Sequence, residues 1–318
     1  MINAMSYVVV HTPYLEQWLP LASNHIGLHV DVVEPDVAVR LRMDAKVQRL
    51  LLLATSGPAS LAMGFEVPDA AALQRVRQAL EAAGYPVVDG TAAEIALRGV
   101  KAMFHFRDPD ANRIEVVWGL ADTAEPLHPG RPIGGFRTGE LGIGHVALMT
   151  GEFERMCHLY KEVLGFKVSD RASAPFKVEF LHVNPRHHTL GLADTGTGAG
   201  VYHLMLEYND FDDVGRAYDM ALENPDSIGV TLGRHINDHV TSFYLKNPDG
   251  WMFELGWAAR TIGPDWQIEE LPGMSLWGHD RTWLAPQKRE AARQILKQLA
   301  ARGVRAPVAM PNPAEKNR

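Results

Sequence analysis

The sequence has a single cysteine, no excess of positive charge and no long hydrophobic run. Because only Cys157 is present, neither an internal disulfide nor a cluster of thiolate metal ligands can form. The formal net charge of −7 argues against nucleic acid as a partner, since such binding needs a basic surface. No stretch reaches the roughly 18 apolar residues that span a bilayer, and the N-terminus lacks a secretory signal pattern. We therefore expect a cytoplasmic protein without nucleic-acid or membrane partners.

Histidine, in contrast, is plentiful and unevenly placed. The chain has 318 residues, enough for two ordinary domains, and 46% of them are hydrophobic, as is usual for globular proteins. Eight of the 14 histidines lie between His145 and His239, in less than a third of the chain. Since histidine is the commonest metal ligand and a frequent proton shuttle, we expect the chemistry in this segment.

Two stretches of the chain resemble each other closely. They are VKAMFHFRDPDANRIEVVWG (residues 100–119) and VTSFYLKNPDGWMFELGW (residues 240–257). Each holds a β-rich run, an Asp/Asn-Pro-Asp turn and a second run that carries a glutamate, which predicts a hairpin of paired strands. Superposing the two stretches matches Glu115 with Glu254.

Two further segments match in the same order upstream. One places Ala62 of LAMGFEV opposite His203 of HLMLEY, and the other places Tyr7 opposite His145. Three matching segments in one order predict a duplication. Both histidines are missing from the first copy, so that half cannot form the same site. We expect the second half to be active and the first to be structural.

The duplication predicts the domain organisation. Each copy is expected to hold two βαβββ modules, and the Pro- and Gly-rich stretch at residues 121–137 indicates a linker between the copies. We place the first domain at residues 1–125, the linker at 126–140 and the second, metal-binding domain at 141–285. A basic helix and a tail are expected over residues 286–318.

The second copy carries two histidines and a carboxylate on three predicted strands. These residues, His145, His203 and Glu254, form the set known as a facial triad, which leaves open positions on an octahedral metal and is typical of non-haem iron(II) chemistry with dioxygen. Glu254 lies between Phe253 and Leu255, which favours burial, and a buried carboxylate needs a cation. The site would favour an anionic chelating substrate.

Four motifs extend this pattern along the second half. They are GHVAL at His145, NPRHHTLGLA around His188, HLMLE at His203 and the long segment GRHINDHVTSFYLKNPDGWMFE, which ends at Glu254. With these motifs the chain resembles the type I extradiol dioxygenases of the vicinal oxygen chelate superfamily, especially the 2,3-dihydroxybiphenyl 1,2-dioxygenase type. The resemblance covers roughly residues 5–280 and includes the duplication.

The resemblance implies a role for each matching residue. His145, His203 and Glu254 would bind the metal. His188 would be the acid–base group, since a histidine can exchange protons near neutral pH. In the pair His187-His188, expected on a strand, one side chain should face inward and the other outward. The other implied residues are Tyr244 and His235 as hydrogen-bond donors to the substrate hydroxyls, Asn237 and Asp238 at the pocket rim, and Phe180 and Ala147 in its apolar wall.

The resemblance also implies a fold and a reaction. The fold would be α+β, with four βαβββ modules in two tandem half-barrel domains of the glyoxalase type. The reaction would be extradiol cleavage of a catechol by dioxygen in aromatic catabolism, with a 3-substituted, aryl or bicyclic catechol such as 2,3-dihydroxybiphenyl as substrate. Iron(II) is the implied metal, although the triad alone does not separate it from manganese(II). We also expect a homo-oligomer.

Two alternative functions are compatible with parts of the pattern. A glyoxalase- or epimerase-like metal lyase or isomerase would share the fold and the metal, but such enzymes usually supply four protein ligands. A non-catalytic module that sequesters a small molecule would typically lack the metal ligands, whereas this chain retains all three. Dioxygen consumption with a panel of catechols separates both alternatives from ring cleavage.

Overall fold

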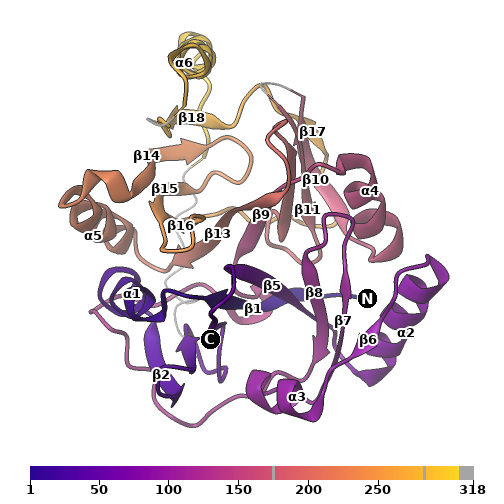
Figure 1. Ribbon diagram of the computed structural model, residues 1–318. Helices are drawn as coiled ribbons and strands as arrows, with labels where there is room; N and C mark the ends of the chain where they lie inside the picture. Colours follow the sequence, from indigo (N-terminus) through magenta and orange to yellow (C-terminus); the bar gives the residue numbers. More distant parts are fainter. Residues whose placement is uncertain (174–175, 282–283, 308–318) are drawn as a thin grey trace.

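The computed structural model describes residues 1–173, 176–281 and 284–307. The end of the expected C-terminal tail, residues 308–318, lies outside these ranges. Figure 1 shows two sheet-based halves that follow each other along the chain, the first in indigo to magenta and the second in magenta to orange. The α+β fold expected from the sequence is confirmed.

The first half is built on an eight-stranded sheet with the strand order β2-β3-β4-β1-β5-β8-β7-β6. Strands β1 and β4 are parallel, as are β5 and β8, while β1 and β5 pair in antiparallel orientation at the centre. The elements of this half are β1 (Ala4–Thr12), α1 (Leu15–Pro20), the π-helical turn η1 (Leu21–Ile26), β2 (His29–Glu34), β3 (Ala38–Arg42), β4 (Leu50–Ala54), β5 (Ser60–Glu66), α2 (Ala70–Ala82), β6 (Val88–Asp89), α3 (Ala92–Arg98), β7 (Ala102–Arg107) and β8 (Arg113–Trp118).

The second half repeats this sheet and extends it at both edges, in the order β17-β10-β11-β12-β9-β13-β16-β15-β14-β18. Without the two edge strands β17 and β18, the order is that of the first sheet. The elements are the 3-10 turn η2 (Gly139–Leu141), β9 (His145–Met149), α4 (Phe153–His158), the π-helical turn η3 (Leu159–Val163), β10 (Lys167–Ala172), β11 (Lys177–His182), β12 (Leu190–Asp194), β13 (Gly200–Tyr208), α5 (Phe211–Leu222), the 3-10 turn η4 (Pro225–Ser227), β14 (Ile228–His235), β15 (Thr241–Lys246), β16 (Met252–Trp257), β17 (Glu269–Glu270), β18 (Ser275–Gly278) and α6 (Pro286–Ala301).

The strand register superposes the two halves residue by residue. The residues that lie in line across the three central strands are Tyr7, Gly64 and Glu115 in the first half and His145, Met205 and Glu254 in the second. This is the match that the sequence comparison predicted. The four-module duplication is therefore confirmed at the level of individual backbone pairs.

The two halves share one hydrophobic core. Phe65 of β5 packs edge-to-face against Tyr160 of η3 and against Phe166, which precedes β10. All three rings are buried. Because these contacts join residues about 100 positions apart, the halves form a common packed unit.

The matching hairpin turns β7–β8 and β15–β16 each contact the opposite half. In the second half, the β15–β16 turn directs Asp249 toward the first, where it accepts hydrogen bonds from Thr12 Oγ1 and from Trp18 Nε1, both at 2.8 Å. In the first half, the β7–β8 turn carries Asp108, which accepts a hydrogen bond from the Tyr160 hydroxyl at 3.3 Å. The duplication thus produces reciprocal contacts between the halves.

The expected basic helix is present as α6, at the end of the second half that is far from the first (Figure 1). It begins with Pro286 in its first turn and is followed by Gly303 at φ +67°, a backbone conformation that favours glycine. Asp280 pairs with two of its arginines, Arg289 and Arg293. Among the described residues, the helices are too short or too polar to cross a membrane.

Candidate metal centre

Three central strands of the second sheet bring His145, His203 and Glu254 together. The Nε2 atoms of the two histidines are 3.0 Å apart, and Glu254 Oε2 lies 3.2 Å from His145 Nε2 and 3.1 Å from His203 Nε2. All three side chains are buried. His203 pairs with Ala147 of β9 and with Met252 of β16, which lie two residues from His145 and Glu254, so all three side chains lie on the same face of the sheet.

The triangle formed by these three atoms fits one face of an octahedral metal site. With metal–ligand bonds of about 2.1 Å, neighbouring ligands on an octahedron are about 3 Å apart. The observed separations of 3.0–3.2 Å match this spacing. Two imidazole nitrogens and one carboxylate are also the donor set of the non-haem iron oxygenases. The residues present therefore fit a divalent transition metal.

The protonation states of His203 and Glu254 suit the binding of a cation. Burial lowers the pKa of His203 to about 4, so its imidazole is neutral and keeps a lone pair at physiological pH. Burial alone would raise the pKa of Glu254, but hydrogen bonds from His145, His203 and His235 hold it well below the usual value. Glu254 is therefore a carboxylate, as a metal ligand must be.

The second oxygen of Glu254 is held by residues that the sequence did not single out. Ser242 of β15 donates a hydrogen bond to Oε1 at 2.6 Å, which leaves Oε2 directed at the two histidines. His279 lies behind Ser242, with its Nε2 3.3 Å from the hydroxyl and its Nδ1 2.8 Å from the hydroxyl of Ser275. Ser242 lies two positions before Tyr244, so strand alternation could have indicated it. His279 follows β18, and no pattern in the sequence pointed to it.

Tyr244 and His235 lie beside His203 and Glu254, as the sequence led us to expect. The Tyr244 hydroxyl is 2.8 Å from His235 Nε2, and the Tyr244 ring packs edge-to-face against His203. His235 Nδ1 lies 2.9 Å from the carbonyl oxygen of Met274, which fixes the ring. Burial raises the pKa of Tyr244 well above its usual value, so the phenol keeps its proton and can donate it in a hydrogen bond.

His188 also lies at this centre, stacked on His145 with ring centroids 3.8 Å apart. The expectation that His187 and His188 lie on a strand and face opposite ways is wrong. Both lie in the turn before β12, where no alternation applies, and both side chains are buried. Burial lowers the pKa of His188 well below its usual value, so its ring is neutral.

Of the four residues expected to contact substrate, two form part of an apolar surface beside the histidines. Phe180 of β11 packs edge-to-face on His188 with ring centroids 4.9 Å apart. Ala147 lies on β9, two residues beyond His145 and so on the same face of the strand. Gly191 lies between them, because a Cβ atom there would be 3.6 Å from Ala147 and 3.7 Å from Phe180.

The other two, Asn237 and Asp238, are buried, which corrects their expected place at a rim. The loop after β14 folds inward and places Asp238 Oδ2 3.9 Å from His188 Nδ1. Asp238 Oδ1 accepts a hydrogen bond from the backbone of Val240, which holds the loop in place. Asn237 Oδ1 is buried and has no hydrogen-bond partner among the described residues, so it can receive a donor from a bound molecule.

The matching position in the first half holds a cation that belongs to the chain. Glu115 accepts hydrogen bonds from Arg98 at 2.7 Å through each oxygen, from Arg113 Nε at 2.9 Å and from the Tyr7 hydroxyl at 2.7 Å. Arg98 is the last residue of α3, and its guanidinium is buried. Arginine thus neutralises the carboxylate that a metal would neutralise in the second half.

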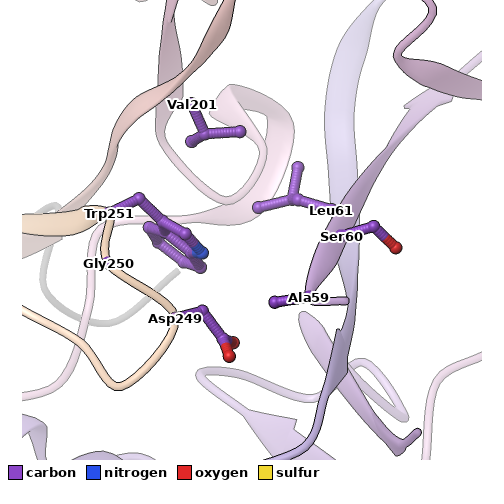
Figure 2. A pocket seen from close by; sticks show the side chains of 7 residues that line it. All are labelled: Ala59, Ser60, Leu61, Val201, Asp249, Gly250 and Trp251. Atoms are coloured by element: carbon purple, nitrogen blue, oxygen red, sulfur yellow. The ribbon is translucent and has the colours of Figure 1, made fainter. Parts of the chain in front are cut away.

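A separate pocket of about 220 Å³ lies between the two halves. Figure 2 shows the Trp251 indole facing Leu61 and Val201 across it, with Asp249 below. Each oxygen of Asp249 accepts one hydrogen bond, from Thr12 and from Trp18, and the described residues that line the pocket include no histidine. The pocket therefore lacks the chemistry of the metal centre, and its lining residues are Ala59, Ser60, Leu61, Val201, Asp249, Gly250 and Trp251.

Comparisons with known proteins agree with the geometry. Residues 142–255 match the Glyoxalase/Bleomycin resistance protein/Dioxygenase superfamily. Biphenyl-2,3-diol 1,2-dioxygenase of Metapseudomonas furukawaii is 33% identical over 285 residues, which cover 87% of this chain and 93% of the relative. The iron-dependent extradiol dioxygenase of Rhodococcus jostii strain RHA1 is 34% identical over 293 residues, which cover 88% of this chain and 97% of the relative.

Solved structures give the same result. A halotolerant catechol dioxygenase superposes with a TM-score of 0.84 at 31% identity, over 89% of this chain and 95% of that one. A manganese(II)-bound glyoxalase from Novosphingobium aromaticivorans, at 21% identity and a TM-score of 0.73 over 87% of this chain and 91% of that one, shows a likeness of fold alone. Both the identities over nearly the full length and the folds lead to one conclusion: the chain belongs to the extradiol dioxygenases of the vicinal oxygen chelate superfamily, of the 2,3-dihydroxybiphenyl 1,2-dioxygenase type.

Proposed function

We propose that this dioxygenase cleaves a catechol with an apolar substituent next to the diol, using iron(II) held by His145, His203 and Glu254. The observation that supports the ligand set is the triangle of nitrogen and oxygen atoms at 3.0–3.2 Å on three central strands. Bound iron(II) would lower the pKa of a coordinated catechol hydroxyl and bring dioxygen next to it.

The residues around the ligands would orient the substrate. Tyr244 is a protonated phenol. Burial opposes a charge on His235, but the hydrogen bond to Glu254 raises its pKa, so Nδ1 can donate to the Met274 carbonyl and Nε2 to the Tyr244 oxygen. This leaves the phenol proton for a substrate oxygen. His188 is neutral and buried beside His145, so it can accept a proton from the diol and return it later. Tyr244 lies on β15 and His188 in the turn before β12, and both side chains are buried among packed neighbours, which holds them in place.

The class of catechol follows from the wall and from the relatives. Phe180 and Ala147 present apolar surface beside the histidines, and Asn237 offers one free carbonyl oxygen. The relatives are named for biphenyl-2,3-diol, 3-methylcatechol and 1,2-dihydroxynaphthalene, which all carry carbon substituents beside the diol. Burial of such substituents against an apolar wall favours binding, whereas burial of a charged substituent would cost the free energy of its hydration.

Dioxygen uptake tests the proposal. Protein loaded anaerobically with iron(II) is mixed with 2,3-dihydroxybiphenyl, 3-methylcatechol or 1,2-dihydroxynaphthalene in aerated buffer. We expect uptake of dioxygen and a yellow ring-fission product, and loss of both in Glu254→Gln protein. If the iron is shown to be bound and no catechol of the panel consumes dioxygen, the proposal fails. Parallel loading with manganese(II) shows which metal supports turnover.

The cellular setting also remains a proposal. We infer a cytosolic homo-oligomer that meets a catechol and dioxygen as its small-molecule partners. Light scattering on purified protein tests the assembly, since a monomer mass of 35.2 kDa would contradict it.

A further inference from the structure

An irregularity in β10 places a carboxylate where a regular strand would not. Val168 pairs with Leu181 and Asp170 pairs with Phe180, so Ser169 is an extra residue in a β-bulge. In a regular strand Ser169 and Asp170 would face opposite sides. Here both side chains are buried. Bulges often redirect a side chain beside an active site, and this one directs Asp170 into the interior.

Asp170 begins a chain of hydrogen bonds that ends at His188. Its Oδ2 lies 2.8 Å from His187 Nε2, and His187 Nδ1 lies 3.1 Å from His188 Nδ1. Asp170 Oδ1 accepts a further bond from the backbone N–H of Glu269 at 2.9 Å, which holds the carboxylate. Among the described residues, none forms a hydrogen bond with His188 Nε2.

Packing holds the middle of this chain in place. The His187 ring contacts the indole of Trp266 edge-to-face, with ring centroids 5.6 Å apart. Trp266 is itself fixed by a hydrogen bond from its Nε1 to the carbonyl oxygen of Ser169, at 2.7 Å. The strand bulge and the segment before β17 therefore enclose His187 together.

The direction of these bonds follows from what each atom can do. A carboxylate only accepts, so His187 Nε2 carries a proton and donates it to Asp170. His188 Nδ1 also faces the carboxylate oxygen of Asp238, at 3.9 Å, which favours the proton between the two rings on His188 Nδ1 and leaves His187 Nδ1 as the acceptor. The proton-free nitrogen of His188 is then Nε2.

We propose that Asp170 and His187 are positioning residues that set the tautomer of His188, so that its Nε2 is ready to accept a proton from the bound diol. The inference rests on the proposed role of His188 in ring cleavage. Neither positioning residue touches the substrate. They act on the reaction only through the orientation and the proton of His188, as carboxylate–histidine pairs do elsewhere.

Two substitutions of one residue separate this role from simple packing. In Asp170→Asn, the new amide donates to His187 Nε2, which moves the proton of His187 to Nδ1 and that of His188 to Nε2. Asp170→Ala removes the partner and leaves both tautomers accessible. We expect kcat to fall at least about 100-fold in Asp170→Asn and about 10-fold in Asp170→Ala, with iron content and KM within about twofold. A purely structural role predicts the opposite order, since asparagine fills the space of aspartate.

Nitrogen-15 NMR of the histidines gives a readout that does not depend on turnover. In protein loaded with zinc(II) in place of iron, we expect the proton of His188 on Nδ1 in the wild type and on Nε2 in Asp170→Asn, with His188→Phe identifying the signals. The control is His182→Gln. His182 is bonded to Ser169 of the same bulge but takes no part in the hydrogen bonds from Asp170 to His188, so this substitution should leave kcat and the His188 NMR signals unchanged.

The outcomes also separate this inference from the proposed function. A His188 proton on Nε2 in the wild type, or a milder effect of Asp170→Asn than of Asp170→Ala, overturns the inference even if the wild type cleaves catechols. If the wild type cleaves none of them, the NMR signals still test the tautomer. Should Asp170→Ala fail to fold, the NMR signals of Asp170→Asn decide.

Discussion

Glu115 and Glu254 occupy matching positions, and their neighbours determine what each carboxylate can hold. Beside Glu254 Oε2 lie the Nε2 atoms of His145 and His203, which can bind a cation together with the carboxylate, so the cation must come from outside. Around Glu115 the nearest groups are arginines and a phenol, which all donate hydrogen bonds. Matching strands and the same carboxylate thus give a group that could hold a metal ion in one half and a closed ion pair in the other.

Two histidines of the centre should respond differently to substitution. His145→Ala removes one of three ligands, so we expect iron content to fall by at least about tenfold. His188→Phe keeps the ligands and the stacked ring, so iron and catechol binding should persist while kcat falls about 100-fold or more. Iron analysis, anaerobic catechol titration and dioxygen uptake measure the three quantities. Normal turnover in His188→Phe would remove His188 from the mechanism.

Ser242→Ala tests whether the orientation of Glu254 matters for the metal. Without the 2.6 Å hydrogen bond to Oε1, the carboxylate can rotate away from His145 and His203. Since hydrogen bonds that hold a metal ligand typically contribute this much, we expect the iron affinity to fall by about 10–100-fold. Ser242→Thr keeps the hydroxyl and serves as the matched variant. Equal iron affinity in Ser242→Ala and wild type would show that the bond has no such role.

At the scale of single elements, the strands could be predicted and their irregularities could not. Alternating apolar residues and the Asp/Asn-Pro-Asp turns indicated the hairpins, and the self-similarity placed Tyr7 opposite His145. The bulges at Ser169 and before His203 insert one residue, which no pattern in a single sequence reveals. For the same reason Asp170 was missed: its inward direction depends on the bulge, and its partner His187 was expected to face solvent.

Helix α3 supplies the cation of the first half, and its last residue can be tested by substitution. Arg98→Met leaves Glu115 buried with only Arg113 and Tyr7 as partners. Removal of one partner of a buried ion pair typically costs about 3–5 kcal/mol, and we expect a loss of that size in the free energy of unfolding in urea. Arg75→Met, on the exposed face of α2, is the control and should change stability by less than about 0.5 kcal/mol.

A second substitution, at Glu115, tests whether the loss of stability in Arg98→Met is due to the unpaired charge. In Arg98→Met/Glu115→Gln no buried charge is left unpaired, so the double variant should regain part of the lost stability. If the double variant is less stable than Arg98→Met alone, the ion-pair account of this site is wrong.

At the scale of the whole molecule, the reciprocal turn contacts join the halves. Asp249 reaches Thr12 and Trp18 from the second half, and Asp108 reaches Tyr160 from the first. The duplication itself was visible in the sequence, but the docking of its copies was not. Contacts between residues 52 to 237 positions apart leave no periodic trace in the chain, so the interface had to come from the structure.

Asp108 makes the stability of this interface depend on pH. Burial raises its pKa from 3.8 to about 6, despite hydrogen bonds from Asn112 that lower it. The folded state therefore binds more protons than the unfolded state between these values, and stability from this group falls as pH rises from about 4 to about 6. In Asp108→Asn this contribution should vanish. In urea unfolding, the free energy of unfolding of the wild type should exceed that of Asp108→Asn by more at pH 4.5 than at pH 7. An equal difference at both pH values would contradict a raised pKa of Asp108.

The arginine beside Glu115 has a consequence for how the protein is made. Since Arg98 neutralises Glu115 in that half, the folding of that half does not require a metal ion. Among the described residues, the triangle of His145, His203 and Glu254 lies in the other half, which packs against the first. We therefore expect protein made without iron to be folded and inactive, and its far-UV circular dichroism should not change when iron(II) restores activity. Iron supply would then determine what fraction of the folded protein is active, and not how much folded protein is present.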